Sequence, residues 1–277
     1  MANSQKAAPA KKSQGFQGIR NAWIVIACCF VLAVLFFQFV LGNPANFENG
    51  DPTAHVKDGS LLGTIYKGGI VVPVIITLLF SVLALSVERL IALSNASGKG
   101  SVAKFVAGVK AAANAGDMAK AQQLCDKQRG VVGNVVAASI KAYQEMEQTT
   151  GLNKDQKIAK IQQAHEEAVQ LEMPTLQMNM PILATIVTLG TLTALFGTVV
   201  GMIRSFAALA SGGGGDSLAL SEGISEALVN TASGILTSWF AVIAYNFYSN
   251  KIDKLTYALD EVGYTIAKTY EANHADA

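Results

Sequence analysis

Four long apolar segments, separated by polar stretches, dominate the hydrophobic pattern of this chain of 277 residues. Around the third segment, no charged residue occurs between Glu172 and Arg204. A helix rises ~1.5 Å per residue, so this stretch is longer than the ~30 Å hydrocarbon core of a bilayer requires. The pattern predicts an all-α integral membrane protein with about four transmembrane helices, in the segments Ala22 to Leu41, Gly69 to Val87, Pro181 to Ile203 and Ala227 to Asn250.

The long polar stretch between the second and third segments has apolar residues at helical spacing. We predict helices over Val102 to Ala115, Met118 to Lys127, Val131 to Met146 and Asp155 to Leu171. These four helices are expected to form a helical cytoplasmic domain between spans two and three.

Lysine and arginine are concentrated in the N-terminal tail, in residues 89–173 and in the C-terminal tail, whereas the loop after the first segment holds only Lys57 and Lys67. Cytoplasmic segments carry the excess of cations, so both termini and the large polar stretch are predicted to be cytoplasmic. We therefore divide the chain into a disordered cytoplasmic tail (1–21), an N-terminal transmembrane helix (22–42), a periplasmic loop (43–68), a transmembrane helix (69–93), the helical cytoplasmic domain (94–175), a transmembrane hairpin (176–250) and a cytoplasmic tail helix that frays (251–277).

The first apolar segment has an alternative interpretation, because its basic flank resembles that of a secretory signal. The segment is long for the apolar part of a signal, however, and Leu41-Gly-Asn-Pro-Ala-Asn-Phe47 offers a poor cleavage site. We therefore predict a retained span.

The third segment differs from a plain membrane anchor in its content of small residues. Gly190, Gly197 and Gly201 fall on one helix face, and Gly197-Thr-Val-Val-Gly201 is a motif that allows another helix to approach closely. Gly234, in the fourth segment, is assigned the same role. These four glycines are predicted to support helix packing.

The third and fourth segments are joined by the short link Ser211-Gly-Gly-Gly-Gly-Asp-Ser217, so they are expected to be antiparallel neighbours. Thr198 and Thr231 are equally far from the middle of the link, which predicts a shared membrane depth. Arg204 is almost level with Glu226, and we expect these two residues to form an ion pair near the outer interface.

The polar residues of this hairpin have a structural and a functional interpretation. Threonine in a membrane helix usually returns its hydroxyl to a backbone carbonyl of its own helix, and Glu226 could be a first-turn acid favoured by the helix dipole. An acid at the mouth of a threonine-lined seam is, however, what a proton or cation path needs. We therefore predict a proton path that includes Glu226, Thr198 and Thr231.

Composition and motifs exclude several other functions. The formal charge is +1, and no cluster of Lys and Arg with interleaved aromatic residues indicates nucleic-acid binding. Cys28, Cys29 and Cys125 do not form a disulfide framework. His165 stands alone, and we interpret it as a surface or partner-packing residue rather than a metal ligand. With no nucleophile beside a base, no metal-ligand spacing and no phosphate loop, we expect no enzyme activity, no metal and no cofactor.

Four sequence motifs carry a family resemblance: Pro181-Ile-Leu-Ala-Thr185, Leu195-Phe-Gly-Thr-Val-Val-Gly-Met202, Gly223-Ile-Ser-Glu-Ala-Leu-Val-Asn-Thr-Ala-Ser-Gly234 and Tyr245-Asn246. In this order they resemble the ExbB/TolQ/MotA family of proton-channel subunits, with ExbB the most similar branch. The resemblance covers about residues 65 to 260. The segment at 22–41 departs from the pattern, because ExbB and TolQ have three spans.

The resemblance implies a multi-pass protein of the bacterial inner membrane that uses the proton motive force to energise TonB-dependent outer-membrane transport. ExbB subunits form a homo-oligomeric ring, usually a pentamer, around ExbD-like single-span subunits with an essential intramembrane Asp, and a TonB-like protein transmits the motion. The implied partners also include membrane lipids. Two alternatives stay open: a TolQ-like or MotA-like stator subunit, and a non-conducting membrane scaffold in which Gly197 and Gly201 hold oligomers together.

Overall fold

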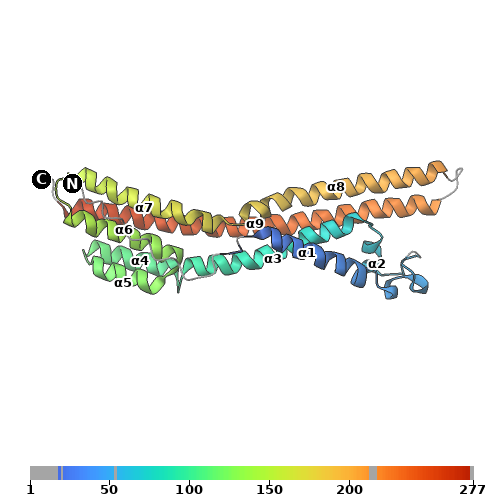
Figure 1. The fold of residues 1–277 in the computed structure, drawn as a ribbon, viewed down its shortest axis with the longest axis horizontal. Coiled ribbons are helices and arrows are strands. Elements are labelled where there is room, and N and C mark those ends of the chain that lie inside the picture. Colours follow the sequence, from blue (N-terminus) through green and yellow to red (C-terminus); the bar gives the residue numbers. More distant parts are fainter. Residues whose placement is uncertain (1–17, 20, 53–54, 212–216, 275–277) are drawn as a thin grey trace. The chain divides into compact units, whose positions relative to one another are not determined.

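The computed structural model describes residues 18–274 except residues 20, 53–54 and 212–216. Most of the predicted disordered tail at 1–21 and the glycine run of the predicted hinge therefore lie outside the described residues. Within the described part, four helical stretches are long and apolar enough to cross a membrane, which confirms an all-α membrane protein (Figure 1). The α-helices are α1 (Ala22–Phe36), α2 (Leu61–Tyr66), α3 (Val71–Ser97), α4 (Val102–Asn114), α5 (Met118–Gln128), α6 (Gly130–Gln148), α7 (Lys154–Gln177), α8 (Met180–Ser211) and α9 (Ser217–Asn273).

The chain forms two compact units, to which α3 and α9 both contribute. The membrane unit comprises Ile19–Glu88 and Asn179–Phe247, and the described part of the bundle unit comprises Arg89–Met178 and the part of α9 that begins at Tyr248.

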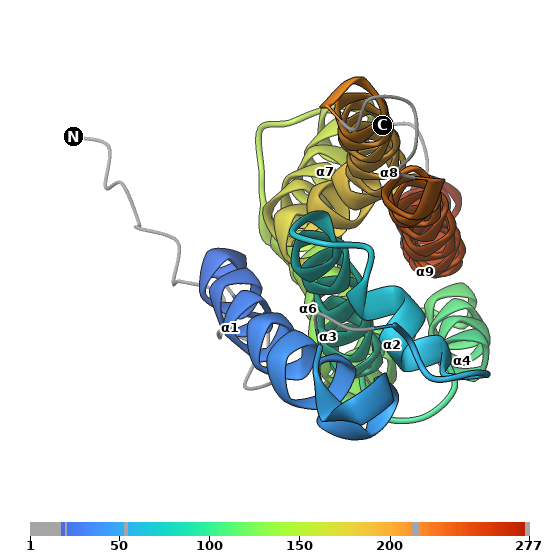
Figure 2. The same cartoon turned by 90° about the vertical axis from the view of Figure 1, so that its right-hand side faces the viewer.

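In the membrane unit, α1 continues into a π-helix, Phe37–Leu41, and packs against α2 and α3. Phe37 stacks on Tyr66 with ring centroids 4.6 Å apart, and Leu41 and Val72 are fully enclosed in the same cluster. Figure 2 shows α1 beside α3. The outer surface of α1 is strongly apolar, and Trp23 is 79% exposed, as expected for a helix that faces lipid.

The loop predicted at 43–68 has more structure than its turn-rich sequence indicates. It contains two short 3-10 helices, Pro44–Asn46 and Glu48–Gly50, an antiparallel bridge between Phe47 and Val56, and the helix α2. The side chain of Ser60 accepts a hydrogen bond from the Gly63 amide and caps α2. Propensity alone did not indicate this helix, because it has fewer than two turns and depends on its cap and on packing against α1.

In the bundle unit, α4 to α7 lie close to the ranges predicted for them, and α7 extends further, to Gln177. Local signals explain the breaks: Asp117 caps α5, Asn153 and Gln156 form a capping box at the start of α7, and Gly130 has a positive φ between α5 and α6. Large side chains fill the core. Tyr143 and Tyr270 meet edge to face, with ring centroids 5.0 Å apart.

Two expectations about this unit are wrong. Over its described residues the C-terminal tail does not fray, because α9 continues to Asn273 and its residues Val262, Ile266 and Tyr270 are buried in the bundle. His165 is not on the surface either: its side chain is buried, and its Nδ1 atom lies 2.8 Å from Ser139 Oγ. Gly263 of α9 makes room for the imidazole ring, since a Cβ there would overlap it.

Candidate functional site

The contact between α8 and α9 is a seam of small residues. The two helices run antiparallel and side by side (Figures 1 and 2). A Cβ atom added to Gly197 would lie 2.5 Å from Asn230 Cβ, and one added to Gly201 would lie 2.8 Å from backbone atoms of Gly223 and Ala227. The facing residues are Gly190 with Gly234 and Ser238, Ala194 with Gly234, Gly197 with Asn230, Gly201 with Gly223 and Ala227, and Ser205 with Gly223.

All four predicted packing glycines therefore lie in a contact within one chain. This differs from the interpretation in which Gly197 and Gly201 hold separate subunits together, because α9 of the same chain already fills the space beside them. Close backbone approach of this kind is how helices pack in lipid, where burying apolar surface gives little drive for association.

At one end of the seam, Arg204 of α8 meets Glu226 of α9. Arg204 Nη1 lies 2.7 Å from Glu226 Oε1 and 2.9 Å from Glu226 Oε2. Glu226 is buried, with 7% of its surface exposed, whereas the Arg204 side chain is 53% exposed. The structure thus brings the predicted pair together, and the charge-assisted contact supplies the hydrogen bonds that a buried carboxylate needs.

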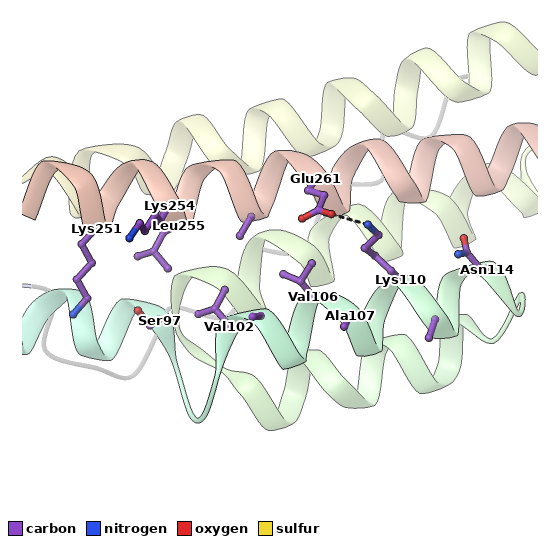
Figure 3. Close-up of a pocket in the computed structure, with 13 residues that line it drawn as sticks. Ser97, Val102, Val106, Ala107, Lys110, Asn114, Lys251, Lys254, Leu255 and Glu261 are labelled. Atoms are coloured by element: carbon purple, nitrogen blue, oxygen red, sulfur yellow. Dashed lines mark hydrogen bonds and ion pairs between the residues drawn. The ribbon is translucent and has the colours of Figure 1, made fainter.

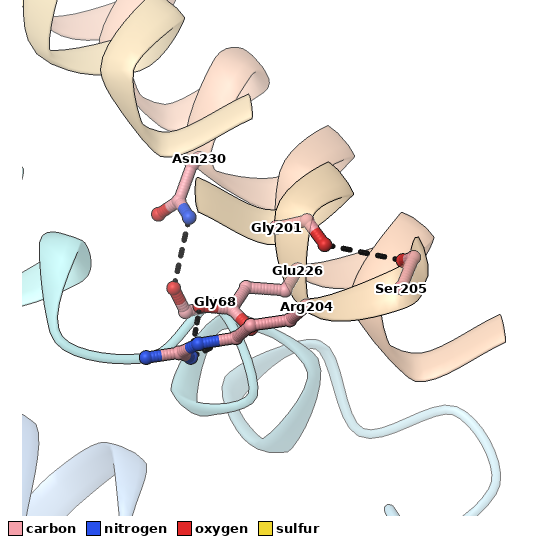
Figure 4. Close-up of polar contacts among 6 residues, drawn as sticks. All are labelled: Gly68, Gly201, Arg204, Ser205, Glu226 and Asn230. Carbon is pink, nitrogen blue, oxygen red and sulfur yellow. Dashed lines mark hydrogen bonds and ion pairs between the residues drawn. The ribbon is translucent and has the colours of Figure 1, made fainter. Parts of the chain in front are cut away.

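A glycine turn between α2 and α3 covers this pair. Gly69 has a φ of +75°, and a Cβ atom there would lie 2.5 Å from Glu226 Oε1. The preceding residue, Gly68, accepts a hydrogen bond of 2.9 Å through its carbonyl oxygen from Asn230 Nδ2 (Figure 4). Neither the contact of Asn230 nor the turn was predicted from the sequence, although the adjacent glycines and an amide inside an apolar helix were available signals.

Beside Arg204 the membrane unit is hollowed by a groove of about 620 Å³. One wall comes from α2 and the segment before it, through His55, Thr64 and Lys67. The other wall comes from α8 and α9 and includes Arg204 and Glu226. The exposed side of the ion pair therefore faces an open groove that several polar side chains line.

Thr198 and Thr231 lie at one level of the hairpin, because Gly197 packs on Asn230 and each threonine follows one of these residues. Both side chains are partly buried. Thr198 Oγ1 donates to the Leu195 carbonyl at 2.6 Å, and Thr231 Oγ1 donates to the Ala227 carbonyl at 3.0 Å. Each hydroxyl thus bonds within its own helix, as in the structural interpretation, and each oxygen keeps lone pairs that can accept a further bond.

Residues 130–261, which run from α6 through α8 into α9, match the model of the MotA/TolQ/ExbB proton channel family. This segment, just under half of the chain, belongs to the MotA/TolQ/ExbB family. The matched segment contains Arg204, Glu226 and both threonines, and it is shorter than the range from 65 to 260 expected from the sequence motifs. The glycine turn and α1 lie outside it.

Individual relatives within the proton channel family agree with this assignment. The chain is 32% identical over 143 residues to the Tol-Pal system protein TolQ of Pseudomonas aeruginosa, a match that covers 51% of this chain and 59% of TolQ. It is 31% identical over 133 residues to an ExbB-like biopolymer transport protein of Synechocystis sp., covering 47% and 48% of the two chains. The chain thus spans less than two thirds of the length of these relatives.

At the other end of the membrane unit, this chain has a second buried acid, Glu88 of α3. Glu88 Oε1 accepts from the Ile19 amide at 2.9 Å, and Glu88 Oε2 accepts from Asn179 Nδ2 at 3.2 Å. Asn179 has a φ of 63° between α7 and α8, and its Nδ2 also donates to the Ile19 carbonyl. These contacts fasten the segment before α1 to α3 and to the start of α8.

The bundle unit has a groove of its own, of about 770 Å³, between α4 and α9 (Figure 3). Alanine and valine supply six of its 13 lining residues, and Lys110 Nζ lies 2.6 Å from Glu261 Oε1 across it. No group of acidic, histidine or cysteine side chains that could hold a metal occurs in the described part of the chain. Burial raises the pKa of Cys125 to about 12, so this thiol is a packing residue rather than a nucleophile.

Proposed function

We propose that this chain is the ExbB-like subunit of an inner-membrane proton channel that energises TonB-dependent outer-membrane transport. The observation that carries the proposal is the Glu226 carboxylate, which is buried and held by Arg204 at the head of the α8–α9 seam, inside the segment that matches the family. A buried acid in a membrane helix marks an ion path more often than a packing site.

In this proposal the groove beside Arg204 admits protons from the periplasmic side. Arg204 holds the Glu226 carboxylate through two hydrogen bonds, and the remaining lone pairs of the Thr198 and Thr231 hydroxyl groups offer acceptors one level further along. The uncharged stretches of α8 and α9 contain no Asp, Lys or His to continue the relay. We therefore propose an ExbD-like single-span partner whose intramembrane Asp completes the path within a homo-oligomeric, pentameric ring. A TonB-like protein transmits the motion. Both termini of this chain are cytoplasmic in the proposal.

A TolQ-like role is the second candidate, because relatives named TolQ are found beside ExbB-like ones. The two roles differ in what a deletion strain loses. In the TonB branch, uptake of large nutrients through the outer membrane fails while that membrane stays intact. In the TolQ branch, this uptake continues in the deletion strain.

The proposed path is tested by removing hydroxyl groups without changing side-chain shape. In liposomes containing this protein and its single-span partner, Thr198→Val or Thr231→Val is expected to abolish proton flux, whereas Thr→Ser at either position retains much of it. Thr185→Val is the matched control, because Thr185 makes the same kind of backbone bond, to the Pro181 carbonyl at 2.8 Å, away from the ion pair. Membrane insertion and oligomer size should be unchanged in every variant.

Wild-type flux in both valine variants would show that these threonines only pack. Absence of flux from the unmodified complex, with oligomers intact, would instead favour the non-conducting scaffold.

A further inference from the structure

The turn between α2 and α3 lies directly over the functional carboxylate. Gly69 places its backbone where a side chain would collide with Glu226 Oε1, and Arg204 Nη1 is 3.3 Å from the same Cβ position. The positive φ of Gly69 and the lack of space both restrict this position to glycine. The turn therefore shields Glu226 on one side, while the groove beside Arg204 stays open.

A hydrogen bond from Asn230 holds this turn in place. It lies one helical turn after Glu226, is completely buried, and donates from Nδ2 to the carbonyl of Gly68, the neighbour of Gly69. On its other side, its Cβ atom packs against Gly197. Val229 flanks the contact, because a Cβ atom on Gly68 would lie 2.9 Å from Val229 Cγ1.

Packing alone does not explain an asparagine here. Among the described residues, Asn230 Oδ1 has no hydrogen-bond partner although it is buried. A buried amide with an unsatisfied oxygen is destabilising relative to an apolar side chain of similar shape. The one bond it makes across the fold is the bond to Gly68, so this bond is the feature that distinguishes asparagine from leucine at position 230.

We propose that Asn230 is a positioning residue for Glu226, which acts by fixing the Gly68–Gly69 turn over the carboxylate. This inference rests on the proposed function in that it takes Glu226 as part of the proton path. With the turn fixed, the carboxylate has one open approach, past Arg204 through the groove. Without the amide, the turn is free to move and Glu226 becomes accessible from a second side.

The test is chemical labelling of carboxylates with a hydrophobic carbodiimide, on the full-length protein in native membranes, read by mass spectrometry of the modified peptides. Asn230→Leu keeps the size of the side chain and removes the donor. It is expected to raise the labelling rate of Glu226 several-fold relative to Glu222, an exposed acid one turn earlier in α9 that serves as an internal reference. Asn230→Ala, which also lacks the donor, should likewise raise the labelling rate of Glu226 relative to Glu222.

Two controls separate positioning from general loosening. Thr237→Val alters another completely buried polar side chain of α9, whose hydroxyl donates to the Ser233 carbonyl of the same helix, and it should leave the Glu226 to Glu222 ratio unchanged. Glu88, buried at the other end of the membrane unit, reports loss of packing. An unchanged ratio in both Asn230 variants, or a rise that Glu88 shares, overturns the proposal.

Labelling does not require transport, so this test is independent of the proposed channel activity. If Glu226→Gln leaves proton flux at the wild-type level, the proposed path is wrong, while selective labelling in Asn230→Leu still establishes that the turn is positioned by Asn230.

Discussion

The seam between α8 and α9 in the membrane unit and the core of the bundle unit pack their helices in opposite ways. The seam between α8 and α9 consists of Gly, Ala, Ser and Asn. The helices approach so closely that a Cβ atom added to one of the glycines would overlap atoms of the facing helix. The core of the bundle includes large side chains such as Tyr143, Ile161 and Tyr270, each no more than 1% exposed. In lipid, burying a large apolar side chain gains little, whereas in water it is the main stabilising term. The seam should therefore be sensitive to added atoms, and the bundle to removed ones.

Adding a side chain to the seam should have the largest effect. In Gly201→Leu, the new Cβ atom alone would lie 2.8 Å from backbone atoms of α9, which cannot rotate away as a side chain can. The two helices must separate, so we expect loss of native oligomers while membrane insertion persists. Crosslinking and size-exclusion chromatography measure the first, and protease accessibility measures the second.

Val199→Leu is the matched control for this variant, because Val199 lies on the same helix and is 50% exposed. It should form wild-type oligomers. Native assembly of Gly201→Leu would mean that the seam can widen. The contrast between the seam and the core of the bundle would then be lost.

Removing atoms from the bundle should have the next largest effect. Ile161→Ala leaves a cavity in a core position that is 1% exposed, and such truncations cost about 2–5 kcal/mol. Thermal unfolding of the full chain in detergent is expected to show this as a lower Tm. Leu171→Ala, on the same helix at a residue that is 80% exposed, should change the Tm little. Equal decreases in the Tm of the two variants would contradict a core that is stabilised by burying apolar side chains away from water.

The features that could be predicted from the sequence are those set by short stretches of chain. The four spans follow from uncharged apolar runs, and the bundle helices follow from helical spacing and breaks such as Gly116-Asp117. The meeting of Arg204 with Glu226 follows from the short link, because a tight antiparallel hairpin fixes which residues are level. In each case the determining residues lie within one or two neighbouring elements.

The features that could not be predicted depend on residues far apart in the chain. Asn230 meets Gly68 across 162 positions, and nothing local to either residue indicates the other. The burial of His165 depends on the space at Gly263. The amphipathic tail could have faced solvent, and only its packing in the bundle shows that it stays helical as far as Asn273. An amphipathic pattern indicates that a face will be covered, but not what covers it.

The smallest predicted effect concerns pH and the buried His165. Desolvation lowers the pKa of His165 below its ordinary value of 6.5, while the carboxylates of Asp260 and Glu166 oppose this shift. The unfolded chain therefore takes up a proton at a higher pH than the folded chain does. The contribution of neutral His165 to stability is complete above pH 6.5 and declines as the pH falls from there toward the lowered pKa of the folded state.

His165→Asn removes the titration and keeps an amide that can reach Ser139, whose hydroxyl lies 2.8 Å from the imidazole Nδ1 atom. The variant is expected to lose some stability at pH 8, and its deficit relative to wild type should shrink as the pH is lowered below 6.5. All other titrating groups are common to both proteins, so the difference between their unfolding curves isolates this histidine. A deficit that stays constant from pH 8 to pH 5 would mean that the imidazole of the folded protein takes up its proton as readily as that of the unfolded chain, and that the bundle core does not exclude charge at this position.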